Sequence, residues 1–265
     1  MVNEFPQALS IAGSDSGGGA GMQADLKTMQ MRHVFATTVL VAITAQNTLG
    51  VQDSMPLPPA MIDAQFASLN DDLQIRACKT GMLADVPTVE CVAANLQKYD
   101  FGPVIVDPVM IAKGGAPLLT DDAIETVKKH LLPLATLITP NLPEAELLTG
   151  MQVDSKEEMV TVGHQLQDLG AKNVLVKGGH FDQSGLAQDF VLLANDESFW
   201  MTSPRFDTIR THGTGDTISA CITAELAKGV PLETAIRTSK AYVTATIRDG
   251  IEVGHGHGPL NHWAL

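Results

Sequence analysis

The chain has 265 residues, 45% of them hydrophobic, and a formal net charge of −13. This composition is typical of a globular protein with a full core. The acidic balance argues against general binding to nucleic acid or to an anionic membrane surface, because either partner would need a basic face on the protein. We therefore expect neither as a partner, while a local positive site for an anionic small molecule stays compatible with this charge.

The N-terminal stretch lacks the basic region and long apolar run of a secretory signal. No segment reaches the ~18 uninterrupted apolar residues that span a bilayer. The cysteines are Cys78, Cys91 and Cys221, an odd number without a C-x-x-C spacing, which fits neither a disulfide framework nor a zinc site. These features predict a cytoplasmic protein with reduced thiols.

Short apolar runs alternate with helical periodicity along the whole chain. Strands are predicted at residues 8–13, 37–47, 103–110, 135–141 and 173–180, and helices at 21–31, 59–73, 86–99, 217–228 and 232–248. Two further runs, 189–195 and 197–203, are separated by about a hairpin's length and predict an antiparallel edge. The alternation predicts an α/β fold with a mostly parallel sheet covered on both faces. Without a linker or an internal repeat, residues 1–265 are expected to form a single domain.

Three of the predicted strands end in a polar side chain, namely Asp107, Asn141 and Lys177. Each residue by itself is equally compatible with a loop, a helix cap or a surface charge. Ligands of open parallel sheets bind outside the carboxyl ends of the strands. The three residues together, with two glycine-rich turns, therefore favour a shared site.

The most familiar phosphate-binding signatures, G-x-x-x-x-G-K-[ST] and G-x-G-x-x-G after a strand, are missing. The segment HGTGDT offers another solution, because Gly213 and Gly215 let the backbone approach a ligand closely. The helix predicted to follow adds free N–H groups and a partial positive charge. Asp216 would then accept a proton from an attacking hydroxyl, a role that loose phosphoryl-transfer chemistry permits even for a weak base. The alternative is that Asp216 only caps the helix.

The motif GTGD at a helix start, with NLPE (141–144) and KGGH (177–180), resembles the ribokinase-like superfamily of small-molecule kinases. Within it, the chain is most similar to the hydroxymethylpyrimidine and hydroxymethylpyrimidine-phosphate kinases of thiamine synthesis. The similarity lies in IAGSDSGGGAGMQADLKT, TAQNTLGVQ, KTGML, DPVMIAKGGAPLL, ITPNLPEAELL and GHGHGPLNHW, and so covers nearly the whole chain. It implies a three-layer αβα sandwich, ATP as phosphoryl donor, Mg²⁺ as the metal and a homodimer.

The resemblance also implies a role for each matching residue. Asp216 would be the base, and Gly213, Thr214 and Gly215 would form the anion hole. The nucleotide would contact Lys177, Asn141 and Thr211, and the metal would be held by Asp107 and Glu144. The pyrimidine would be bound by Gly13, Asp25, Thr44, Gln46, Met82 and Val109. Two carboxylates suit a hard cation, and a lysine suits phosphate. Glu144 is equally explained as a favourable residue of a first helical turn.

The amide of Gln46 is the residue that bears most on the substrate. It presents a donor and an acceptor side by side, which matches the ring nitrogen and amine of an aminopyrimidine, whereas pyridoxal lacks that amine. One position departs from the family, because pyrimidine kinases usually carry Cys where this chain has Asp216, while ribokinases and many pyridoxal kinases carry Asp. Gln46 is alternatively a satisfied loop amide, Asp25 an exposed helix residue and Met82 plain core.

These features leave three rival functions open. The first is a pyridoxal kinase with the same mechanism, the second a non-catalytic vitamin- or nucleotide-binding regulator, and the third an oxidoreductase. The intact Asp216, Lys177 and glycine pair argue against the regulator, and the missing dinucleotide fingerprint argues against the oxidoreductase. Residues 113–120 are expected to form either a mobile lid or a passive turn. The resemblance suggests that one site phosphorylates both the alcohol and its monophosphate.

Overall fold

The computed structural model describes residues 4–110, 119–179 and 185–264. Through them runs one nine-stranded sheet with the order β3-β2-β1-β4-β5-β6-β7-β8-β9. Its strands are β1 Gln7–Gly13, β2 Phe35–Asn47, β3 Gly50–Pro56, β4 Ile75–Thr80, β5 Val104–Val106, β6 Leu137–Ile138, β7 Val174–Lys177, β8 Leu186–Leu192 and β9 Ser198–Pro204. Strands β1, β2 and β4 to β7 are parallel, whereas β3 at one edge and the β8–β9 hairpin at the other are antiparallel.

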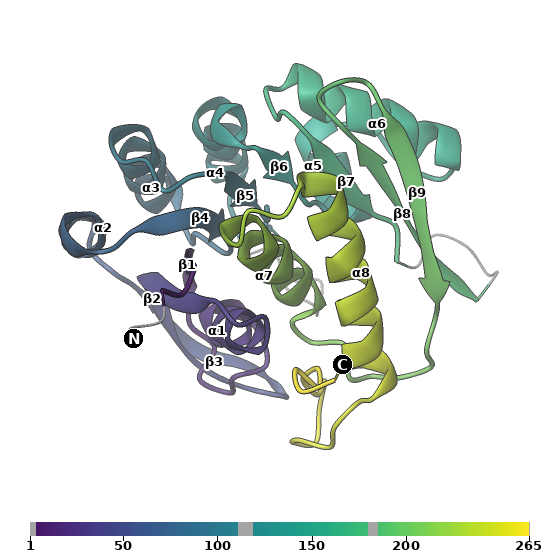
Figure 1. Ribbon diagram of the computed structural model, residues 1–265, viewed down its shortest axis with the longest axis horizontal. Helices are drawn as coiled ribbons and strands as arrows, with labels where there is room; N and C mark the ends of the chain where they lie inside the picture. Colours follow the sequence, from purple (N-terminus) through teal and green to yellow (C-terminus); the bar gives the residue numbers. More distant parts are fainter. Residues whose placement is uncertain (1–3, 111–118, 180–184, 265) are drawn as a thin grey trace.

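Helices cover both faces of this sheet, as predicted, and make a three-layer sandwich (Figure 1). One face carries α1 Gly21–Met31, α7 Thr214–Ala227 and α8 Leu232–Arg248. The other carries α2 Pro59–Asp72, α3 Val86–Lys98, α4 Asp121–Thr126 with the irregular helical turns that follow it to Leu134, α5 Leu142–Thr149 and α6 Lys156–Asp168. Among the described residues, no helix is both long and apolar enough to cross a membrane.

Alternation along β5 shows how the two faces are filled. Ile105 packs with Ile218 and Ile222 of α7, whereas Val106 belongs to the larger apolar cluster on the opposite face. Central strands covered on both sides need apolar residues at successive positions, and this requirement explains their nearly continuous apolar runs.

Helix α7 lies centrally, between the sheet, α1 and α8 (Figure 1). Its buried alanines, Ala220, Ala224 and Ala227, pack with Ala8 of β1 and Ala77 of β4. Small side chains on both sides let the helix lie close to the strands. The N-terminus of α7 is thereby brought to the carboxyl edge of the sheet.

Most predicted elements are confirmed, and the differences have local causes. Helices 21–31 and 232–248 are observed with those bounds, and so is an antiparallel β8–β9 pair. The central strands are shorter than predicted, and Pro103, Pro108 and Pro140 flank them, residues that cannot donate to a sheet ladder. The chain also forms β3 and β4, which the sequence reading missed. All residues of β3 are exposed, and β4 combines an exposed Arg76 with a buried Lys79, so neither strand shows a simple apolar pattern.

Candidate active site

The polar strand ends predicted to share a site lie side by side at the carboxyl edge of the sheet. Asp107 directly follows β5, Lys177 ends β7, and Asn141, after β6, forms an isolated parallel bridge with Lys177. Strands β5, β6 and β7 are consecutive neighbours in the sheet. The three side chains therefore share one edge because of strand order.

Asp107 is the centre of this group and is only 1% exposed. Its Oδ1 accepts hydrogen bonds from Lys177 Nζ at 3.0 Å and from Thr139 Oγ1 at 3.1 Å, and its Oδ2 accepts one from Ser219 Oγ at 3.4 Å. Burial alone would raise the pKa of Asp107, but the ammonium groups of Lys177 and Lys79 outweigh it and lower the pKa. Asp107 is therefore held as a buried carboxylate by neighbouring cations.

Glu144 lies beside this pair, in the first turn of α5. Its Oε2 accepts from the Asn141 backbone N–H at 2.8 Å, while Asn141 Oδ1 accepts from the Glu144 N–H at 2.9 Å. This reciprocal capping box bears out the interpretation of Glu144 as a helix-start residue. Glu144 is also buried, and burial, with the charge of Asp107, raises its pKa to about 7 although Lys177 opposes the shift.

The glycine turn before α7 lies against these groups. Gly213 is the N-cap of α7 with φ of 83°, and Asp216 sits in the first turn of the helix. The alternative in which Asp216 is itself the cap is therefore wrong. A Cβ atom at Gly215 would lie 3.2 Å from Lys177 Nζ and 3.4 Å from Asp107 Oδ2, so the backbone closely approaches both side chains. Thr214 Oγ1 donates to the Thr211 carbonyl at 2.8 Å, which closes the turn.

A second buried lysine, Lys79, lies under the same helix start. Its Nζ is 2.7 Å from Asp25 Oδ1 and 3.7 Å from Asp216 Oδ1. Lys79 was not among the predicted site residues, because its strand was not recognised. The available signal was the motif KTGML, in which a lysine stands directly before a glycine-containing turn.

The structure corrects the interpretation of Asp25. Its side chain is fully buried, with Oδ1 bound to Lys79 and Oδ2 accepting from Ser10 Oγ at 2.5 Å. Neither a direct substrate contact nor an exposed position on the helix agrees with this placement. Asp25 instead supports Lys79, because the buried face of α1 turns it towards β4.

The other predicted substrate residues gather at the ends of β1, β2, β4 and β5. The Gly13 N–H donates to the Met82 carbonyl at 3.2 Å, and a Cβ at Gly13 would lie 2.5 Å from Met82 Cε. Thr44 is buried, and its hydroxyl donates to the Ser14 carbonyl at 2.8 Å. Val109 and Met82 are half-buried. Apart from Thr44 and Gln46, these residues have no polar side-chain atoms.

Gln46 meets His212, a residue that the sequence reading did not single out. The two Nε2 atoms are 3.3 Å apart, and His212 Nε2 is also 3.3 Å from Asp15 Oδ2. Asp15 accepts backbone N–H bonds from Gly17, Gly19 and Ala20. Burial would raise the pKa of Asp15, but His212 and these N–H donors lower it. The glycine-rich loop after β1 is thus tied through Asp15 and His212 to the turn before α7.

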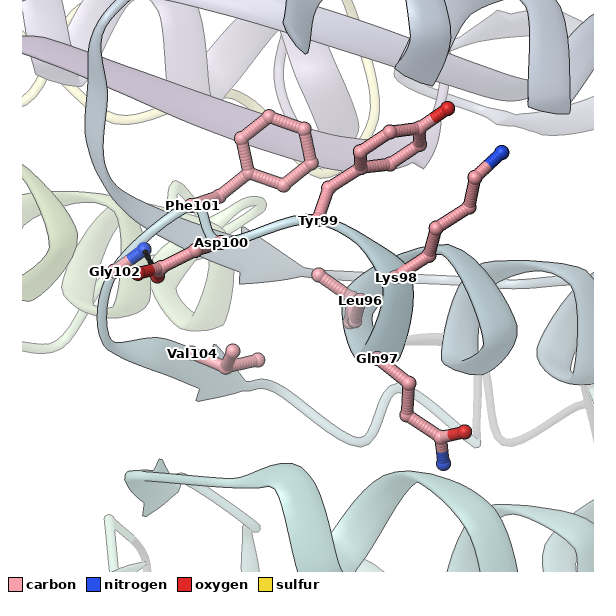
Figure 2. Close-up of a pocket in the computed structure, with 8 residues that line it drawn as sticks. All are labelled: Leu96, Gln97, Lys98, Tyr99, Asp100, Phe101, Gly102 and Val104. Atoms are coloured by element: carbon pink, nitrogen blue, oxygen red, sulfur yellow. Dashed lines mark hydrogen bonds between the residues drawn. The ribbon is translucent and has the colours of Figure 1, made fainter.

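The opposite edge of the sheet has a different character. Figure 2 shows a hollow lined by residues 96–102 and Val104, where α3 turns into β5. This hollow lies at the amino end of β5, whereas Asp107 follows its carboxyl end. None of the predicted site residues lines it. The predicted lid at 113–120 lies, except for Leu119 and Thr120, outside the described residues, as does His180.

Comparison with known proteins places this arrangement in context. A family model described as phosphomethylpyrimidine kinase matches residues 15–261. The hydroxymethylpyrimidine/phosphomethylpyrimidine kinase of Haemophilus influenzae is 55% identical over 265 residues, covering 99% of this chain and 98% of that protein. The thiamine biosynthesis bifunctional protein ThiED of Geobacter sulfurreducens is 46% identical over 262 residues, which are 97% of this chain and 53% of that protein.

A solved structure extends the comparison to three dimensions. The ADP complex of Bacillus subtilis pyridoxal kinase superposes with a TM-score of 0.91 at 37% identity, covering 98% of each chain. The predicted ribokinase-like α/β sandwich is confirmed by this likeness.

Proposed function

The chain belongs to the phosphomethylpyrimidine kinase family, and on that premise we propose that it phosphorylates 4-amino-5-hydroxymethyl-2-methylpyrimidine, and then its monophosphate, in thiamine biosynthesis. The predicted ATP-dependent kinase activity agrees with the names of its relatives. The observation that carries the site assignment is the start of α7, where a glycine turn lies against Lys177 and Asp107 with Asp216 beside it. The oxidoreductase alternative has no support in this family.

The glycine turn and Lys177 are proposed to bind the transferring phosphoryl group. The first turn of a helix presents N–H groups without intrahelical partners and a partial positive charge. Among the described residues, no side chain caps these groups in α7. Burial disfavours the charged form of Lys177, yet Asp107 and Glu144 raise its pKa, so it remains an ammonium group. Phosphate oxygens would thus meet backbone N–H groups and one fixed cation, with Asn141 and Thr211 close by.

Asp107 and Glu144 fit the Mg²⁺ that the family implies. Both are buried, and the charge of Asp107 opposes ionisation of Glu144 although the nearby Lys177 favours it. In the described part of the chain there is no cluster of three or more potential metal ligands. Two carboxylates, completed by phosphate oxygens and water, form the ordinary environment of Mg²⁺ in phosphoryl-transfer enzymes. The bound ion would neutralise charge on the phosphates.

Asp216 is proposed to accept the proton of the substrate hydroxyl at a carboxylate oxygen. The hydroxyl oxygen forms a bond to the γ-phosphorus of ATP, while the bond from that phosphorus to the bridging oxygen of ADP breaks. The proton released by the alcohol passes to Asp216, which stands one residue beyond the Gly213–Gly215 turn. Positioning supplies most of the catalysis, because the transition state is loose and needs little help from the base until late.

Gln46 is proposed to select the pyrimidine. Its side-chain amide is half-buried near the end of β2, next to His212. A site built around such hydrogen bonds rejects an analogue lacking the partner groups by roughly 10⁴-fold. Discrimination against pyridoxal should therefore be large if both amide atoms pair with the ring.

A homodimer is proposed for the β2–β3 edge. Ile43 and Met55 pair across these strands and are 42% and 57% exposed, and Val51 is 52% exposed on the same hairpin. A two-stranded edge with exposed apolar side chains gains stability when a second surface covers it. Sedimentation of the Met55→Glu variant against the unchanged chain tests this point, since loss of the dimer is expected.

A single domain spanning 1–265 and a cytoplasmic location remain predictions.

ATP consumption by the purified protein with Mg²⁺ tests the proposed function. Hydroxymethylpyrimidine, its monophosphate and pyridoxal are offered in parallel, and preferential turnover with the two pyrimidines is expected. Preference for pyridoxal would support the second candidate, which is favoured by Asp216 and by the likeness to the Bacillus subtilis enzyme. No turnover with any of these alcohols would favour a non-catalytic regulator.

A further inference from the structure

We propose that Lys79 is a positioning residue for the phosphoryl-transfer step, whose buried ammonium group holds the carboxylate of Asp216 in place at the start of α7. The proposal rests on the function proposed above, in which Asp216 receives the substrate proton. Lys79 belongs to neither the predicted phosphate contacts nor the predicted metal ligands. Its proposed action on the reaction is through Asp216.

The contacts of Lys79 form a short buried chain from α1 to α7. Ser10 of β1 donates to Asp25 Oδ2, Asp25 Oδ1 binds Lys79 Nζ at 2.7 Å, and Lys79 Nζ lies 3.7 Å from Asp216 Oδ1. The side chains of Asp25 and Lys79 are 0% exposed, whereas that of Asp216 is 16% exposed. The buried ammonium group of Lys79 therefore lies between a buried carboxylate and a partly exposed one.

The local backbone leaves room for this contact. Gly81 follows β4, and a Cβ there would stand 3.6 Å from Lys79 Nζ and 3.9 Å from Asp216 Oδ1. Ala12 of β1 would meet the same Cβ at 3.1 Å. Glycine at this position thus keeps the space between the lysine and the aspartate free of side-chain atoms.

Lys79 keeps its positive charge in spite of its burial. Burial lowers the pKa of Lys79, but the carboxylates of Asp25, Asp216 and Asp107 outweigh burial and raise it. Lys79 therefore stays charged, whereas burial raises the pKa of Asp25 to about 7 although Lys79 opposes the shift. A lysine ammonium carries three donors, so the pair with Asp25 leaves Lys79 able to interact with Asp216. At 3.7 Å, the ammonium group of Lys79 fixes where the carboxylate of Asp216 lies.

A second ion pair joins the same two helices and supplies a matched control. Arg32, just after α1, lies 2.6 Å from Glu225 near the C-terminal end of α7. Glu225 also binds Lys228 at 2.8 Å. This pair joins the end of α1 to α7, whereas Asp25 and Lys79 join α1 to β4, and it lies at the end of α7 away from Asp216.

The experiment compares D25N/K79M with R32M/E225Q, so that each variant removes a pair and neither leaves a buried charge alone. Melting temperature, the KM for ATP and kcat with hydroxymethylpyrimidine are measured for both. We expect D25N/K79M to lower kcat about 10- to 100-fold, the scale of a displaced proton acceptor, with an unchanged KM for ATP. R32M/E225Q should keep kcat within about twofold. An unchanged kcat in D25N/K79M, or an equal fall in both variants, overturns the proposal.

A double-mutant cycle with D216N separates this proposal from the function on which it rests. If Lys79 acts through Asp216, D25N/K79M should change kcat less than about threefold in the D216N background. An equal fold-loss in both backgrounds would make Lys79 a purely structural residue while leaving the kinase function standing. Unchanged kcat in D216N alone would instead remove the base assignment, and the positioning role with it.

Discussion

The two ends of α7 are built from similar ingredients but differ in what they leave open. At the C-terminal end, Glu225 binds Arg32 and Lys228, so the charges satisfy one another. At the N-terminal end, Lys177 and Lys79 lie near a helix start to which no described side chain forms a capping hydrogen bond. Unused N–H donors beside the Lys177 ammonium group support the proposed anion site at this end, whereas a closed ion pair contributes only to stability. We therefore expect the N-terminal end of α7 to serve the reaction and its C-terminal end to serve packing.

The largest effect is expected from removing the charge of Asp216. Asp216→Asn should lower kcat about 10³-fold, within the range for a positioned proton acceptor, while the affinity for ATP changes little. Glu225→Gln is the matched change at the other end of the helix and should leave kcat within about twofold. Steady-state kinetics and nucleotide titration measure both. Unchanged turnover in Asp216→Asn would mean that the two ends of α7 do not differ in catalysis.

The glycines that flank α7 give a second comparison of its two ends. Gly213 and Gly229 have nearly equal positive φ, 83° and 82°. An alanine Cβ at Gly213 would overlap the Gly19 carbonyl oxygen, whereas one at Gly229 meets nothing within 4 Å. Gly229→Ala should therefore cost only about 1 kcal/mol of backbone strain and preserve activity.

Gly213→Ala should have the same backbone strain. It should also lower kcat/KM about 10²-fold, because the turn before α7 and the loop at Gly19 must move apart. Thermal melts and kinetics on the two variants give the result. Equal activity in both would contradict the close fit proposed for the glycine turn.

Gln46→Ala tests, at the N-terminal end of α7, whether substrate binding can be changed without changing nucleotide binding. The KM for the pyrimidine should rise about 10- to 100-fold, since a buried polar group of the substrate loses its partner, with little change in the KM for ATP. Thr202→Ala, on the exposed edge strand β9, is the control and should alter neither constant. Equal increases in both KM values would assign Gln46 a structural role.

The smallest effect concerns His262, which lies 3.1 Å from Thr217 Oγ1 in the first turn of α7. Burial, with some help from Lys27, lowers the pKa of His262 to about 4. This pKa lies below that of histidine in the unfolded chain, near 6.5. The contribution of neutral His262 to the free energy of unfolding is therefore fully present above pH 6.5. It is lost as the pH falls from about 6.5 towards 4.

His262→Gln should remove about 1–2 kcal/mol of the stability difference between pH 7 and pH 5. Urea unfolding at the two pH values measures it, and His164→Gln, at an exposed position of α6, should leave the difference unchanged. A slope that persists in His262→Gln would assign the acid sensitivity to other groups.

Local patterns in the sequence predicted much of this molecule. Helical periodicity located α1 and α8 with their bounds. Apolar runs located most strands along the chain, because burial on both faces of the sheet demands apolar residues at successive positions. The motifs HGTGDT and NLPE indicated the turn before α7 and the first turn of α5, since turns and helix starts are made by neighbouring residues. The predicted ligands and roles of these residues remain to be tested by the experiments above.

Only the tertiary structure decided which distant residues meet. The sequence predicts that Asp25 either binds the substrate or lies exposed on its helix, and its partner Lys79, 54 residues away, stands on a strand that has no clear apolar pattern. His212 and Gln46, 166 residues apart, meet because β2 and the segment before α7 end at the same edge of the sheet. Periodicity along a chain records which face of an element is buried. It does not record which strand lies beside it, and the charge that supports Asp216 comes from that neighbour.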